Sequence, residues 1–196
     1  MDESPAPITI VSGLPRSGTS LMMQMLDAGG IPVLTDKIRT ADSDNPKGYW
    51  EFEPVKTLKQ SQAWLSDAPG KAVKMVHLLL LDLPRAGFSY RVIFMQRNIK
   101  EVLASQGVML QRQGKSGAAL NEETLGAIFQ KQMERVKNYM KENPQFSVLN
   151  VNYNELLSGP TSVVSQINSF LDGNLNAEKM LSVIDPSLYR QKKSNP

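Results

Sequence analysis

The chain contains no cysteine and only one histidine among its 196 residues. Without cysteine, disulfides and thiolate metal sites cannot form, and we expect no metal site. The N-terminus lacks a basic stretch followed by a long apolar run, so we expect neither a secretory signal nor a transmembrane segment, and by default a cytoplasmic location. The charge is nearly balanced, with 22 Lys and Arg against 19 Asp and Glu. This balance argues against a nucleic-acid partner.

The remaining composition is that of a folded protein, because 41% of the residues are hydrophobic and 21% are charged. The length suits a single domain over 1–196, with flexible tails at 1–6 and 187–196. Apolar runs alternate with helix-period stretches, which predicts a central parallel sheet in a three-layer α/β/α sandwich. We expect strands at 8–12, 72–76, 90–96 and 147–153, and helices at 18–29, 53–65, 99–113, after Asn121, 160–171 and 176–184.

The first chemical motif is SGLPRSGTS, residues 12–20, between the first strand and the first helix. Gly13, four residues and Gly18 form the frame of a phosphate-binding loop, whose amide groups and helix dipole attract anionic oxygens. Loops that bind nucleoside triphosphates continue with Lys, but this position is Thr19. The positive charge lies inside the loop at Arg16, so we expect an anion site whose charge comes from that arginine.

A second motif follows the strand at 90–96. Arg97 stands at the carboxyl end of that strand, and Ser105 lies about two turns into the next helix. A guanidinium and a hydroxyl facing one groove suit a second phosphate group. Together the motifs predict a ligand with two separate phosphate sites.

The stretch Leu78–Asp82 offers a competing interpretation, because four apolar residues and an aspartate can place a magnesium-binding carboxylate at a strand tip. With such a carboxylate, the protein would be a P-loop kinase or NTPase. Four leucines fit a short helix better than a β-branched strand. Together with Thr19 in place of lysine, this disfavours phosphoryl transfer.

The motifs resemble those of sulfotransferases that use 3′-phosphoadenosine 5′-phosphosulfate (PAPS), a family with a P-loop NTPase-like fold. The stretch 15–20 is similar to the loop for the 5′-phosphosulfate, and 97–105 is similar to the motif for the 3′-phosphate. The stretches 45–51, 74–77 and 151–157 resemble other family segments. The resemblance implies a donor site made of Pro15, Arg16, Ser17, Gly18, Thr19, Ser20, Arg97, Ser105 and Tyr153.

The resemblance also implies metal-independent, in-line transfer of a sulfuryl group to a hydroxyl or amine, with Arg16 and Lys74 as catalytic cations. Three residues compete for the role of base: His77 and Asp36 rank about equally, and Glu51 comes third. The acceptor is expected to be a small molecule, a lipid or a carbohydrate, held by the loops 36–52 and 107–122. A protein that binds the nucleotide without catalysis stays an alternative.

The chain departs from the family pattern in two places. Leu21 replaces the aromatic residue that often stacks on adenine, and the basic C-terminal motif is absent. The tail carries only Arg190, Lys192 and Lys193. A solvated tail is the favoured interpretation of these charges.

Overall fold

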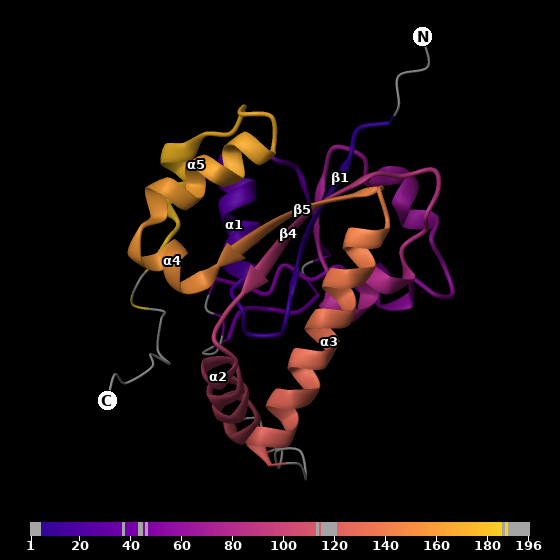
Figure 1. Ribbon diagram of the computed structural model, residues 1–196. Helices are drawn as coiled ribbons and strands as arrows, with labels where there is room; N and C mark the ends of the chain where they lie inside the picture. Colours follow the sequence, from indigo (N-terminus) through magenta and orange to yellow (C-terminus); the bar gives the residue numbers. More distant parts are fainter. Residues whose placement is uncertain are drawn as a thin grey trace.

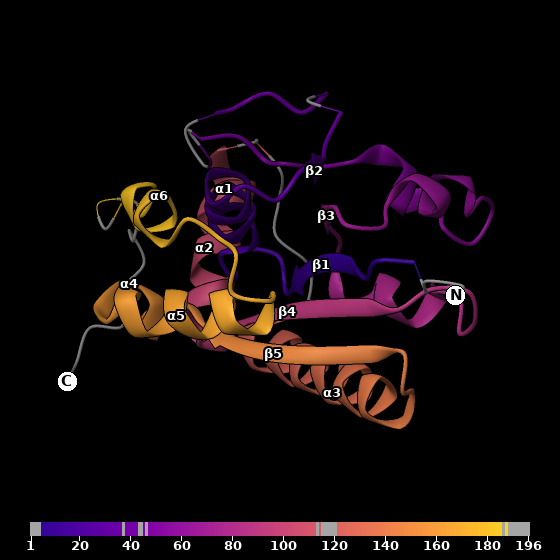
Figure 2. The ribbon, with the colours of Figure 1, turned by 90° about the horizontal axis from the view of Figure 1, so that it is seen from above.

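The computed structural model describes residues 5–36, 38–42, 45, 47–112, 114, 121–185 and 187. Its centre is a sheet of five parallel strands in the order β2-β3-β1-β4-β5, which follow one another from top to bottom in Figure 2. The strands are β1 (Ile8–Gly13), β2 (Val33–Leu34), β3 (Ala72–Lys74), β4 (Tyr90–Gln96) and β5 (Phe146–Asn152). The predicted α/β fold with a parallel sheet is confirmed.

Helices cover both faces of this sheet. One face carries α1 (Thr19–Gly29), α4 (Tyr153–Ser158), α5 (Pro160–Phe170) and α6 (Ala177–Ser182). The other face carries α3 (Glu122–Glu142), packed beside the 3-10 helix η3 (His77–Asp82). The helix α2 (Ile99–Arg112) and the first half of α3 extend past the carboxyl ends of the strands (Figure 1).

The alternation of side chains along the strands divides the core into two clusters. In β4, Val92 and Phe94 pack with α3, whereas Ile93 and Met95 pack with α1 and α5. All four side chains are fully buried. β4 is therefore buried on both faces, as its unbroken apolar sequence predicts.

Several predicted boundaries change. The helix predicted at 53–65 is wrong: two 3-10 helices form instead, η1 (Glu53–Thr57) and η2 (Ala63–Asp67). The buried Val55 and Leu58 are three residues apart, which matches the repeat of a 3-10 turn. The strand predicted at 72–76 ends at Lys74, and β2 and α4 were not predicted.

The carboxyl ends of β1, β3 and β4 lie at one edge of the sheet, since all strands run in the same direction. The loop after β1, the turn after β3 and the start of α2 therefore converge there. None of the helices in the described part of the chain is long and apolar enough to cross a membrane.

Candidate active site

The loop between β1 and α1 is held in shape by glycine conformations and by its own hydrogen bonds. Gly18 has a φ of 97°, and Arg16, at φ 71°, also adopts the left-handed region that side chains rarely enter. The Ser17 hydroxyl donates to the Leu14 carbonyl at 2.7 Å, and the Ser17 amide donates to the same oxygen at 3.2 Å. Ser17 therefore shapes the turn through two hydrogen bonds inside the loop.

Gly18 marks the closest approach of this loop to α4. A Cβ atom at this position would lie 2.3 Å from Cδ2 of Tyr153. The tyrosine ring is buried against the start of α1, where the first helical amides lack partners inside the helix. The sequence Gly18-Thr19-Ser20 thus opens an eleven-residue helix whose N-terminus can receive an anion.

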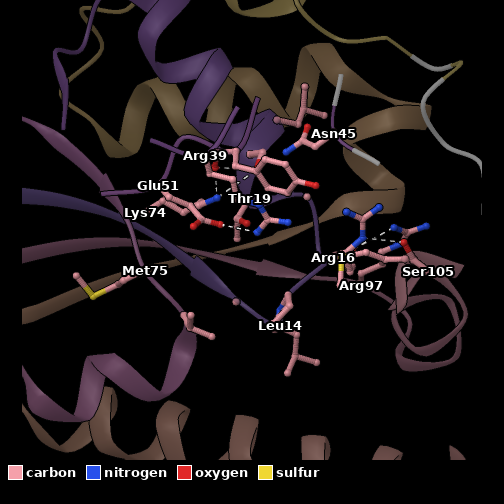
Figure 3. Close-up of a pocket in the computed structure, with 18 of the residues that line it drawn as sticks. Leu14, Arg16, Thr19, Arg39, Asn45, Glu51, Lys74, Met75, Arg97 and Ser105 are labelled. Atoms are coloured by element: carbon pink, nitrogen blue, oxygen red, sulfur yellow. Dashed lines mark hydrogen bonds and ion pairs between the residues drawn. The ribbon is translucent and has the colours of Figure 1, made fainter. Parts of the chain in front are cut away.

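Arg16, Arg97 and Ser105 meet on one side of this loop, as Figure 3 shows. Arg16 Nε donates to Ser105 Oγ at 2.9 Å, and Arg97 Nη1 donates to the Arg16 carbonyl at 3.1 Å. The Arg97 guanidinium carbon lies 4.8 Å from the centroid of the Tyr153 ring. The structure thus brings together two arginines and a hydroxyl from three separate elements, which suits a phosphate group.

Arg97 is fixed by a buried carboxylate that the sequence analysis did not single out. Its Nε donates to Glu101 Oε2 at 2.9 Å, and both side chains are nearly inaccessible. Asn154 donates to Glu101 from α4, at 3.2 Å. Arg97 lies two residues before α2 and Glu101 lies in its first turn, and this spacing of four residues was a signal for the pair.

Lys74 lies on the other side of the loop, at the end of β3 (Figure 3). Its ammonium donates to the Tyr49 carbonyl and lies 3.4 Å from Ser20 Oγ. Burial lowers the pKa of Lys74 to about 8, although the charge of Glu51 works in the opposite direction. Arg16 is turned away toward Ser105, so Lys74 is the cation that contacts the start of α1 on this side of the loop.

Glu51 lies beside Lys74 and lines the cavity there. Arg39 Nη1 lies 3.0 Å from one of its carboxylate oxygens, and Lys56 Nζ lies 3.4 Å from the other. Arg39 also lies over the Tyr49 ring, 3.3 Å from its centroid. The segment 36–52, predicted to contact the acceptor, therefore contributes one cation, Arg39, and one carboxylate to this side of the cavity.

The other two candidate bases do not line this cavity. His77 is 3% exposed, and its Nε2 is 3.1 Å from Gln132 Oε1 of α3. Burial lowers the pKa of His77, and its polar contacts offset this only in part. The Asp36 carboxylate accepts from the amides of Glu53 at 2.5 Å and Ile38 at 3.0 Å, which hold its pKa below the ordinary value.

Asp82, the candidate magnesium ligand, also lies away from the loop. It ends the 3-10 helix η3 and is 3.6 Å from Lys59 Nζ. The expected short helix at this place is confirmed, so Asp82 is not at a strand tip. The described residues contain no group of three or more His, Cys, Asp and Glu that could hold a metal ion.

One cavity of about 480 Å³ connects the two sides of the loop. Most of the predicted donor residues line it: Pro15, Arg16, Gly18, Thr19, Ser20, Arg97, Ser105 and Tyr153. The sequence analysis did not name Arg39, Lys56, Val108, Met109 or Arg112, which line it too. Val108, Met109 and Arg112 lie three, four and seven residues after Ser105, so they share its face of α2. This spacing was a signal that they line the cavity too. The tail residues Arg190, Lys192 and Lys193 lie outside the described residues.

The fold and the loop define a P-loop-like α/β protein with two neighbouring groups of cationic and hydroxyl side chains. The family model for the sulfotransferase domain matches residues 7–196. The chain belongs to this sulfotransferase domain family. No curated protein matches the sequence.

Solved structures of sulfotransferases have a similar fold at low sequence identity. The sulfotransferase domain of the Synechococcus PCC 7002 olefin synthase has a TM-score of 0.57 at 16% identity, over 100% of this chain and 92% of that chain. The sulfotransferase domain from the curacin biosynthetic pathway has a TM-score of 0.54 at 16% identity, over 93% of this chain and 79% of that chain. Sulfotransferase STF9 from Mycobacterium avium has a TM-score of 0.54 at 16% identity, over 92% of this chain and 67% of that chain.

Proposed function

We propose that the protein transfers a sulfuryl group from PAPS to a hydroxyl group. The observation that carries this proposal is that two groups of cationic and hydroxyl side chains line one cavity, each suited to an anion. The group made of Arg16, Arg97 and Ser105 would hold the 3′-phosphate. The N-terminus of α1 and Lys74 would hold the 5′-phosphosulfate, and the buried Tyr153 would lie beside the nucleoside.

In the proposed reaction, the acceptor oxygen attacks sulfur as the bond between sulfur and the 5′-phosphate oxygen breaks. Negative charge grows on that phosphate oxygen. Fixed donors at such an oxygen typically stabilise the transition state by about 3 kcal/mol each. Lys74 and the amides of Thr19 and Ser20 are placed for this role, and Arg16 holds the other phosphate.

The proton of the acceptor hydroxyl must pass to a base within hydrogen-bond reach. We assign this role to Glu51, because its carboxylate lines the cavity beside Lys74. Asp36 is engaged with two backbone amides, and His77 is buried against α3. The products are then the sulfate ester of the acceptor and adenosine 3′,5′-bisphosphate.

The test is thermal stabilisation by adenosine 3′,5′-bisphosphate compared with ATP and magnesium, because a ligand of the native state raises apparent stability. We expect the bisphosphate to stabilise the protein and Arg97→Ala to weaken its binding about ten- to a hundredfold. Lys100→Ala is the matched control, since Lys100 is an exposed cation three residues away that does not line the cavity.

Arg97→Ala removes the cation beside the buried Glu101 carboxylate, so the double variant Arg97→Ala/Glu101→Gln is measured too. Stronger stabilisation by magnesium ATP would contradict the proposal and favour a kinase or NTPase. An acceptor screen with labelled PAPS then separates an active sulfotransferase from a protein that only binds the nucleotide.

A further inference from the structure

Trp50 has a backbone conformation that a residue with a bulky side chain rarely adopts. Its φ is 55°, in the left-handed region that favours glycine and that asparagine tolerates. Gly48, two residues earlier, is also left-handed at φ 87°. A left-handed residue other than glycine costs free energy, and it persists only where the surrounding structure enforces it, most often near a functional site. The turn at residues 48–50 is therefore held against its own backbone preference.

Side-chain contacts hold this turn in place. Tyr49 is buried, and its hydroxyl donates to the Asp42 carboxylate at 2.7 Å. Arg39 packs its guanidinium against the ring of the same tyrosine. The indole Nε1 of Trp50 donates to the Lys47 carbonyl at 3.2 Å. These contacts offset the cost of the left-handed residue.

The φ angle of Trp50 sets the direction of the planar peptide that precedes it. The carbonyl of that peptide belongs to Tyr49, and it accepts hydrogen bonds from the Lys74 ammonium and, at 3.2 Å, from the Ser20 hydroxyl. A rotation of this peptide that returned Trp50 to a negative φ would turn the carbonyl away from both groups. The left-handed residue therefore keeps a hydrogen-bond acceptor against Lys74.

Lys74 needs such an acceptor to stay in one place, because its ammonium ends a flexible four-carbon stem. In the described part of the chain, its hydrogen bonds go to the Tyr49 carbonyl and the Ser20 hydroxyl. The same turn continues directly into Glu51, whose carboxylate lies beside Lys74 in Figure 3. One backbone conformation thus places both the cation and the carboxylate on this side of the cavity.

Building on the proposed function, we propose that Trp50 is a positioning residue for sulfuryl transfer. Its left-handed backbone holds the Tyr49 carbonyl against Lys74, and this hydrogen bond keeps the ammonium at the 5′-phosphate of the nucleotide. The backbone of Trp50, rather than its indole ring, has this role. A residue that tolerates a positive φ can therefore replace Trp50, whereas one that does not releases Lys74.

The experiment titrates adenosine 3′,5′-bisphosphate into two variants of similar size that both lack the indole ring. Asparagine tolerates the left-handed region, whereas the β-branched valine does not. We expect Trp50→Val to weaken bisphosphate binding about tenfold, the usual effect of losing a hydrogen bond to a charged group. Trp50→Asn should stay within about threefold of the wild type. In a Lys74→Ala background, Trp50→Val should cause little further loss, because Trp50 acts through Lys74.

Asp172→Val is the matched control, because Asp172 is also left-handed, at φ 69°, but does not line the cavity. This variant should lose stability and keep its bisphosphate affinity. If Trp50→Val does not fold, Trp50→Ala and Trp50→Gly repeat the comparison, since glycine adopts a positive φ freely and alanine does not. Thermal unfolding of each variant shows whether it is folded.

Equal affinities of Trp50→Val and Trp50→Asn would overturn this inference, and so would a further tenfold loss in the Lys74→Ala background. Tighter binding by Trp50→Val would overturn it too, because the Tyr49 carbonyl would then compete with the nucleotide for Lys74. All these outcomes leave the proposed function intact, since the wild type binds the bisphosphate in each of them. Absence of binding by the wild type would refute the proposed function, and this inference with it.

Discussion

Lys74 shows how one buried cation can serve two roles. Its ammonium contacts the Tyr49 carbonyl and the Ser20 hydroxyl, so it joins the segment 36–52 to the start of α1. Burial lowers its pKa to about 8, because a charged amine is poorly solvated there. An anionic phosphosulfate would restore favourable interactions for the charged form. The proposed donor therefore binds best to protein in which Lys74 is protonated.

This ionisation predicts a pH dependence. In the free protein the charged form of Lys74 is lost above about pH 8, so kcat/KM for PAPS should fall about tenfold per pH unit above that value. Lys74→Arg should remove this decline, since a guanidinium stays charged throughout the range. The measurement is kcat/KM from pH 6 to 10. The same decline in Lys74→Arg would assign it to another group.

The three candidate bases can be separated by three isosteric or near-isosteric variants. Glu51→Gln should lower kcat about a hundredfold or more, the usual contribution of a general base. Asp36→Asn and His77→Gln should keep kcat within about threefold. The measurement is turnover of a confirmed acceptor at saturating PAPS, with thermal stability as the control for folding. A hundredfold loss in His77→Gln with unchanged stability would transfer the role to His77.

Most residues that line the cavity around the loop after β1 could be predicted from the sequence, because Gly13, Gly18 and Arg97 follow fixed spacings around strands. Their individual contacts could not be predicted. The contact of Lys74 with Tyr49 involves a backbone carbonyl, and no residue type in the sequence signals such an acceptor. The direction of His77 depends on the 3-10 helix η3, whose rotation follows from packing against α3.

At the scale of elements, the junction between the loop and α1 depends on space as well as on backbone conformation. Gly18 and Gly30 flank α1, with φ values of 97° and 105°. A Cβ atom at Gly30 would meet nothing within 4 Å, whereas one at Gly18 would overlap the Tyr153 ring. A side chain at Gly30 would therefore be opposed by backbone conformation alone. A side chain at Gly18 would be opposed by backbone conformation and by the Tyr153 ring.

We expect Gly30→Ala to destabilise the protein by about 1–2 kcal/mol, the cost of a left-handed residue with a side chain. Gly18→Ala should cost more, because the Tyr153 ring must move. That ring lies against Arg97, so bisphosphate binding should also weaken at least tenfold in Gly18→Ala and stay unchanged in Gly30→Ala. Denaturant unfolding and bisphosphate titration measure the two effects. Equal affinities in the two variants would show that the ring does not position Arg97.

Element prediction succeeded where a periodic pattern was long. The bounds of β4 match the prediction, and its unbroken apolar residues fix it as a central strand. The helix predicted at 53–65 was wrong, because the spacing of its buried residues fits short 3-10 turns as well as one α-helix. The two-residue strand β2 carries too few residues for any period, and its pairing with β3 depends on tertiary packing.

At the scale of the whole molecule, the order of strands decides where the site lies. β1 is central, between β3 and β4, so the loop that follows it is flanked by Lys74 on one side and Arg97 on the other. The sequence predicted a parallel sheet but not this order. The separation of the two anion sites across the loop therefore becomes clear only in the folded chain.

His77 contributes to the whole fold through its contact between η3 and α3. The ring is buried and its pKa is lowered, so the native protein holds it neutral. The unfolded chain takes up a proton below the ordinary histidine pKa of about 6.5. Stability is therefore fully present above that pH and is lost as the pH falls below it.

The chain has a single histidine, so a change in stability between pH 7.5 and 5.5 can be assigned to it. We expect the free energy of unfolding to fall by up to about 1.4 kcal/mol over this range in the wild type. His77→Gln can still reach Gln132 but does not titrate, so its stability should vary much less. Urea unfolding at both pH values measures this difference. Equal losses in the two proteins would mean that His77 takes up its proton in the native state, which would return it to the candidates for proton transfer.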